Sequence, residues 1–168
     1  MDHGDWTEER HLVRAELKSL LKHVLPPEVR KDAWTPKEVL HHILVANRGS
    51  LHLLERLYSR GSDFSARVSG SWPVREELLD FSEQRAFSVG AFPGTEPDRT
   101  VTNDVMQEME ALEDEKFQTL GTAADSLELQ RLGFRHPLAG TLNFYEWLCF
   151  CTVHERLHLA RLKKDLGI

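Results

Sequence analysis

The chain has 168 residues, of which 40% are hydrophobic and 29% charged, a balance typical of one folded domain rather than of a disordered chain. Its net charge of −6 argues against non-specific nucleic-acid binding, which needs cations to neutralise phosphates. The polar start and the lack of any run of ~18 apolar residues predict no secretory signal and no membrane span. Cys149 and Cys151 would point different ways on a helix, so we expect no mutual disulfide and a cytoplasmic location.

Hydrophobic periodicity predicts two helices in the first part of the chain. Residues 6–24 carry apolar side chains at helical spacing, and Pro26 and Pro27 end that helix. A second helix begins near Thr35, which serves as N-cap, and runs to about Arg60.

Residues 61–101 are rich in Gly and Pro, so we expect a long connection there with one short helix around 74–87. A third helix is predicted over 103–120. After a second loop region over 121–142, a fourth helix runs over 143–166.

These elements predict an all-α fold, a four-helix bundle with a long crossover between the second and third helices. We expect residues 1–168 to form a single domain, because we find no internal repeat and no strand-like alternation of useful length. Bundles of this kind build metal sites from side chains on facing helices.

Nine histidines are the unusual feature of the composition, because imidazole is a common metal ligand. His154 and His158 stand one helical turn apart, so both imidazoles can reach one ion. Both lie within an apolar stripe that faces the core. The alternative is a pair of core histidines, each satisfied by a hydrogen bond, but two at ligand spacing are harder to satisfy without a metal.

The same string, His154-Glu155-Arg156-Leu157-His158, also matches the H-E-x-x-H signature of zinc proteases. That interpretation needs a third ligand downstream. Asp165 is the one suitable residue there, and at two turns, or ~10 Å, past His158 it is too far to complete the site. We therefore look for the third ligand elsewhere.

His42 is the best third ligand on geometry, because its helical face carries apolar residues and so points into the bundle. His41 lies about 100° away and is expected at the surface, as is His52. His136 precedes a proline and is expected to be a turn or capping residue. The other candidates lie on the first helix or at its frayed start: His3, His11 and His23.

Five further residues can assist a metal site, each with a simpler alternative. Cys151 can approach the metal or fill the core. Glu155 can act as a base or as a hydrogen-bond acceptor for a ligand, or it can be a solvated carboxylate. Glu38 can orient the His42 ring or cap its helix. Arg56 and Arg161 can hold a substrate carboxylate.

Two blocks of the sequence resemble the DinB/YfiT-like superfamily. WTPKEVLHHI, residues 34–43, is similar to its W-S-P-x-E-V-L-x-H-L helix opening. Residues 136–158, with HPLAGTL, then EWL, then the two histidines, are similar to its H-P-x-x-G-x-L…E-W-L…H-x-x-x-H ending. The chain departs from the pattern at Thr35, usually Ser, and at Asn143, where Thr or Ser is frequent; both still suit a cap.

The resemblance implies a four-helix bundle with a divalent metal held by His42, His154 and His158, and commonly a homodimer. Members include thiol S-transferases that use bacillithiol, mycothiol or glutathione, and metal-dependent hydrolases. Imidazole suits both Zn²⁺ and Ni²⁺. We therefore expect a metal-dependent enzyme acting on a small-molecule substrate, such as a thiol transferase with a low-molecular-weight thiol. The alternatives are a metal-dependent hydrolase and a non-catalytic metal-binding stress-response protein.

Overall fold

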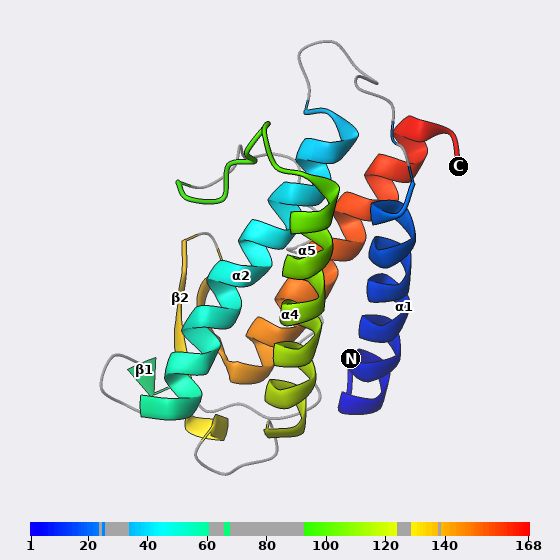
Figure 1. The fold of residues 1–168 in the computed structure, drawn as a ribbon. Helices are drawn as coiled ribbons and strands as arrows, with labels where there is room; N and C mark the ends of the chain where they lie inside the picture. The colour runs from blue at the N-terminus through cyan, green and yellow to red at the C-terminus, as the bar shows by residue number, and fades with distance from the viewer. Residues whose placement is uncertain (24, 26–33, 61–65, 68–92, 124–128, 138) are drawn as a thin grey trace.

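Four long helices dominate the computed structural model, which describes residues 1–23, 25, 34–60, 66–67, 93–123, 129–137 and 139–168 (Figure 1). The helices are α1 (His3–Leu21), α2 (Pro36–Arg60), α4 (Asn103–Ala123) and α5 (Phe144–Leu166). Each of α1 and α2 packs against both α4 and α5. The short helix expected around 74–87, most of the crossover and the expected helix stops at Pro26, Pro27 and Gly61 lie outside the described residues.

The first helix begins earlier than the periodicity predicted. The Asp2 carboxylate accepts from the backbone N–H of Asp5 at 2.9 Å, and the Asp5 carboxylate accepts from the backbone N–H of Asp2 at 3.1 Å. This reciprocal cap satisfies amides that the helix start would otherwise leave unpaired. His3 is therefore the first residue of α1 and not part of a frayed terminus.

The other helices lie where caps and periodicity predicted them. Thr35 and Glu38 form a reciprocal cap at the start of α2. Asn143 does the same for α5 with Glu146, and Gly167 ends that helix with a positive φ of 74°. The third predicted helix is correct in its start at Asn103 but extends three residues further, to Ala123.

A small antiparallel sheet departs from the expected all-helical fold. Its strands are β1 (Ala66–Arg67), β2 (Leu132–His136) and β3 (Gly140–Asn143), in the order β1-β2-β3, and a 3₁₀ turn at Leu129–Arg131 precedes β2. The prediction of a loop over 121–142 was wrong here because strands of four or five residues carry too short an alternation to detect. Gly133 allows the pairing, since a Cβ on it would lie 2.3 Å from the Leu142 carbonyl oxygen.

The sheet holds the start of α5. Trp147 on α5 donates its indole N–H to the Phe134 carbonyl of β2 at 3.1 Å, and the two rings stack at 4.1 Å. β3 then leads directly into the Asn143 cap. The position of α5 along the molecule is thus set by the hairpin as well as by helix packing.

Two hydrophobic clusters fill the interior. One includes Trp6, Leu54, Phe117 and Tyr145, and the other includes Leu17, Ile43, Met106 and Leu159. Between them on the four helices lie buried polar residues, which we call the buried polar layer: Arg10, Arg14, Asn47, Glu110, Glu113 and Glu155. On every helix the layer residues lie between the two clusters or at the edge of one. The layer therefore runs across the bundle and separates the two hydrophobic clusters.

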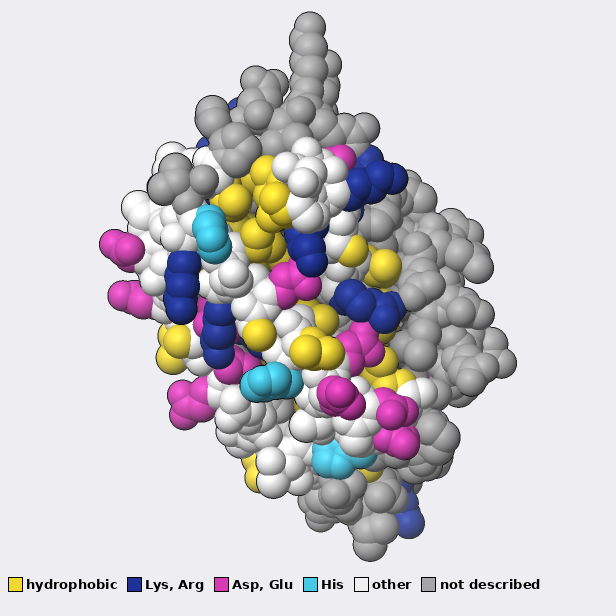
Figure 2. All heavy atoms as spheres, turned by 90° about the vertical axis from the view of Figure 1, so that its right-hand side faces the viewer, with side chains coloured by type: hydrophobic (Ala, Val, Ile, Leu, Met, Phe, Trp, Pro, Cys, Tyr) yellow, Lys and Arg dark blue, Asp and Glu magenta, His cyan; other side chains and the backbone are white. Residues whose placement is uncertain are grey.

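The face that carries α1 mixes both signs of charge. Acidic, basic and histidine side chains are interspersed there with hydrophobic ones (Figure 2). Ion pairs join α1 to α5 at this side, Glu9 to Arg156 at 2.9 Å and Glu16 to Lys163 at 3.1 Å. Among the residues that the structure describes, no helix is long and apolar enough to cross a membrane.

Candidate metal centre

The three histidines predicted as ligands lie together, and we call them the three-histidine cluster: His42, His154 and His158. One ring nitrogen from each can be chosen so that all three lie within 4.8 Å of one another. The His42 ring centroid is 5.5 Å from that of His154 and 4.9 Å from that of His158. This geometry can hold a single metal ion.

Two helices bring the cluster together, as the sequence predicted. His154 and His158 are one turn apart on α5, and their Nε2 atoms are 3.1 Å apart. His42 comes from α2, which packs directly against α5. The spacing on one helix and the facing of the other were therefore sufficient to select these three from nine histidines.

A backbone carbonyl orients the His42 ring. Its Nδ1 lies 2.7 Å from the carbonyl oxygen of Thr95, so Nδ1–H donates and Nε2 keeps its lone pair for the cluster. Metal-binding histidines commonly donate their second N–H to such an acceptor, which fixes the tautomer. Nothing in the sequence around Thr95 indicates this role, because any residue type supplies a carbonyl.

Burial favours the uncharged form of all three imidazoles. It lowers the pKa of His158 to about 4, with a smaller contribution from His42. Burial, with the neighbouring imidazoles, takes the pKa of His154 well below its ordinary value, and burial lowers that of His42 despite its bond to Thr95. Neutral imidazoles are the form that binds a cation, so the chemistry of the three donors fits a divalent metal.

Two aromatic rings lie beside the cluster. The Trp34 indole lies 4.8 Å from the His42 ring, and the Phe150 ring stacks parallel to His154 at 6.1 Å. Both aromatic side chains are partly exposed, as are His154 and His158. A ligand that reached the cluster past these two rings would meet flat apolar surfaces.

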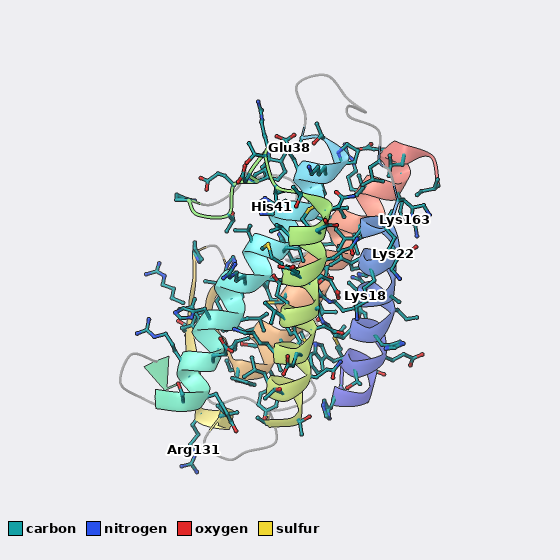
Figure 3. The ribbon with its side chains drawn as sticks, viewed as in Figure 1. Lys18, Lys22, Glu38, His41, Arg131 and Lys163 are labelled. Atoms are coloured by element: carbon teal, nitrogen blue, oxygen red, sulfur yellow. The ribbon has the colours of Figure 1, made fainter. Side chains whose placement is uncertain are left out.

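His41 corrects one expectation. It is 7% exposed rather than a surface residue, and its Nδ1 accepts from the backbone N–H of Asp98 at 2.8 Å. It lies near the N-terminal end of α2 beside Glu38, where the segment containing Asp98 passes over the helix (Figure 3). The segment 93–102 thus contacts α2 through both neighbouring histidines, which covers the ring that periodicity alone placed at the edge.

His136 lies beside the cluster, with its ring 4.4 Å from that of Phe150, but its own hydrogen bond is to a turn. The Nδ1 of His136 accepts from the backbone N–H of Ala139 at 3.0 Å, which confirms the predicted turn role, and burial lowers the pKa of His136 to about 4. The side chains of three others are exposed: His11, His23 and His52.

The assisting residues take mostly the simpler of their predicted roles. Glu38 caps α2 and pairs with Arg99 at 2.8 Å rather than with His42. Cys151 is a free, buried thiol in the core, and burial raises its pKa to about 12. Arg161 pairs with Asp165 at 3.3 Å along α5, and Arg56 is partly buried on α2.

None of the three roles predicted for Glu155 matches its surroundings in the structure. It is neither solvated nor directed to a ligand, but fully buried at 0% exposure between Arg10 and Arg14. Burial alone would raise its pKa, but the two guanidinium groups outweigh that effect and hold the pKa below its usual value. The sequence signal that we missed was polar residues at core-facing positions on all four helices.

Comparison of the chain with protein-family models, with curated proteins and with solved structures finds no match. A functional assignment therefore depends on the residues and on their geometry.

Proposed function

We propose that the chain is a divalent-metal-binding protein in which His42, His154 and His158 hold Zn²⁺ or Ni²⁺. The observation that carries this proposal is the convergence of three neutral imidazole nitrogens within 4.8 Å, from two helices. Three protein ligands leave room for a further ligand, an arrangement typical of catalytic rather than closed structural zinc sites.

We also propose that the chain is a four-helix bundle of the DinB/YfiT-like type, with a long crossover between α2 and α4. The two clusters of hydrophobic residues occur in the same order along α2 and α4 and in the opposite order along α1 and α5. The common direction of α2 and α4, which pack together, supports a long crossover between them. The resemblance of the two sequence blocks supports the same architecture and, as a further prediction, a homodimer.

The enzyme that this site supports best is a metal-dependent thiol S-transferase acting on a small molecule. A divalent cation supplies a Lewis acid that lowers the pKa of a bound thiol or water. The protein's own part is to hold His42 through Thr95 and to present the Trp34 and Phe150 rings to an apolar substrate.

Elemental analysis of protein purified without a chelating tag tests metal binding. We expect about one Zn or Ni per chain in the parent, and loss of that metal in His42→Ala, His154→Ala and His158→Ala. His52→Ala is the matched control, because His52 is an exposed histidine on the same helix as His42. Absence of stoichiometric metal from the parent, with zinc stabilising it no more than it stabilises His154→Ala, would contradict the proposal.

Activity requires a separate assay. The metal-loaded protein is incubated with an electrophile and, in turn, with bacillithiol, mycothiol and glutathione, and consumption of free thiol is followed. We expect consumption with at least one thiol, and its loss in His154→Ala. If metal is bound but every thiol fails, the result favours a non-catalytic metal-binding protein or a hydrolase.

A further inference from the structure

Three helices meet at one buried carboxylate, and one of its partners links it to the fourth. Glu155 on α5 accepts from Arg10 Nη1 at 2.6 Å and from Arg14 Nη1 at 3.2 Å, both from α1. It also accepts from the Asn47 side-chain amide of α2 at 2.9 Å. Arg14 extends the contacts to α4, where Nη2 donates to the Glu110 carbonyl oxygen at 2.6 Å.

The Asn47–Glu155 hydrogen bond joins the two helices that carry the three-histidine cluster. Glu155 directly follows His154 on α5, and Asn47 lies five residues after His42 on α2. Consecutive residues leave a helix about 100° apart, so Glu155 points into the buried polar layer while His154 points to the cluster. The layer and the cluster are therefore adjacent along the same two helices but on different faces.

Apolar packing alone leaves the register of two helices weakly specified, because one leucine contact replaces another when the helices slide. A buried amide bonded to a buried carboxylate does not tolerate sliding, since both groups would lose their partners inside the core. A slip of one turn is about 5.4 Å. A slip of that size exceeds the 4.8 Å within which all three ligand atoms lie, so it would separate His42 from the two histidines of α5.

We propose that Asn47 is a positioning residue for the metal centre: its buried hydrogen bond to Glu155 sets α2 against α5 and thereby holds His42 within reach of His154 and His158. Asn47 is 1% exposed and touches none of the three ligands in the contacts described, so it acts through the helices. The inference rests on the proposed metal site, and it adds a residue that no ligand-spacing argument selects.

The test compares Asn47→Leu with Thr152→Val. Each change replaces one buried polar group by an apolar group of similar size, and each removes one hydrogen bond between helices. Thr152 on α5 accepts from the Trp6 indole of α1 at 3.1 Å, so its loss leaves the α2–α5 contact intact. Thr152→Val is therefore a matched control for a general loss of stability.

Zinc affinity is measured by competition with a chromophoric chelator, on protein shown by circular dichroism to be folded. We expect Asn47→Leu to weaken affinity roughly tenfold, as changes behind a metal's direct ligands commonly do. The zinc affinity of Thr152→Val should stay within about twofold of that of the parent, although this variant loses about as much metal-free stability as Asn47→Leu. Asn47→Ala, which needs no extra space, repeats the measurement if Asn47→Leu does not fold.

A metal-free readout separates this inference from the proposed function. The His42 and His158 rings, 4.9 Å apart, should give an NMR cross-relaxation peak in the parent and in Thr152→Val, and a weaker one in Asn47→Leu. Equal effects of the two variants on affinity and on this peak, or an unchanged Asn47→Leu, would overturn the inference. A parent that binds no zinc would overturn the metal site instead, while the ring contact still reports on the positioning.

Discussion

The three-histidine cluster and the buried polar layer are neighbours on α2 and α5, but their buried polar groups differ in charge. The groups of the layer form ion pairs, whereas those of the cluster are neutral bases. The layer carries its cations within the protein, as Arg10 and Arg14 lie against Glu155 and Glu110. The cluster presents three uncharged bases within 4.8 Å of one another. Adjacent residues of one helix, His154 and Glu155, thus lie in different electrostatic environments, one among neutral imidazoles and the other between two guanidinium groups.

The largest expected effect comes from removing a cation of the layer. Arg14→Met leaves Glu155 and Glu110 without one of their partners inside the core, and we expect a loss of about 3–5 kcal/mol in the free energy of unfolding. Urea denaturation of the metal-free protein measures it. Lys116→Met is the control: Lys116 pairs with Glu55 at 2.8 Å outside the layer, with side chains 42% and 38% exposed, so the loss should stay below about 1 kcal/mol. Equal losses in the two variants would show that the layer adds nothing beyond surface pairing.

The cluster should respond to an added cation, whereas the layer should not. Zinc at 100 times its dissociation constant is expected to stabilise the parent by about 2.7 kcal/mol, because only the folded chain brings the three imidazoles together. His154→Ala should show almost none of this gain, and Arg14→Met should keep it. Thermal denaturation with and without zinc measures the difference. A gain that persists in His154→Ala would place the bound zinc elsewhere.

The layer and the cluster should give the protein opposite pH dependences of stability. The lowered pKa values of the cluster histidines make stability rise as pH rises toward their ordinary value of 6.5, because below it the unfolded chain binds protons that the folded chain excludes. Burial raises the pKa of Glu113 to about 8, with Arg14 offsetting only part of the effect. The folded chain then holds a proton that the unfolded chain releases near its ordinary pKa of 4.5, so the contribution of Glu113 to stability falls as pH rises between these values. The fall is at most about 1.4 kcal/mol for each pH unit.

Glu113→Gln tests this directly, since glutamine keeps the shape of a protonated glutamate but cannot titrate. Relative to Glu113→Gln, the parent should lose unfolding free energy as pH rises from 6 to 7, because the histidines contribute equally to both proteins. The measurement is urea denaturation at each pH. Parallel curves for the two proteins would place the titrating group elsewhere.

The smallest effect comes from the start of α5, a helix that carries residues of both regions. Asn143→Ala removes a cap whose side chain accepts from the Glu146 backbone N–H at 3.0 Å, and should cost about 1 kcal/mol of stability. Because the loss falls on the helix end and not on either region, metal stoichiometry should stay that of the parent. Loss of metal in this variant would mean that the cap, and not only the Asn47–Glu155 bond, positions the ligands.

Local features predicted the helices and the cluster well. Caps at Thr35 and Asn143 placed the starts of α2 and α5, and a one-turn spacing selected His154 and His158. The strands β2 and β3 were not predicted, because strand pairing joins two short segments, whereas helical periodicity lies within a single segment. His41 and Glu155 escaped it because their environments come from distant parts of the chain.

The sequence by itself determined where the helices lie and which face of each is apolar, because hydrogen bonds and periodicity within a helix are local. It also determined that two histidines on α5 share a face. Only the tertiary structure decided that Thr95 turns the ring of His42 and that Glu155 meets Arg10, Arg14 and Asn47 rather than water. Those outcomes depend on which helix packs against which and in what register, and such contacts join residues that no local pattern connects.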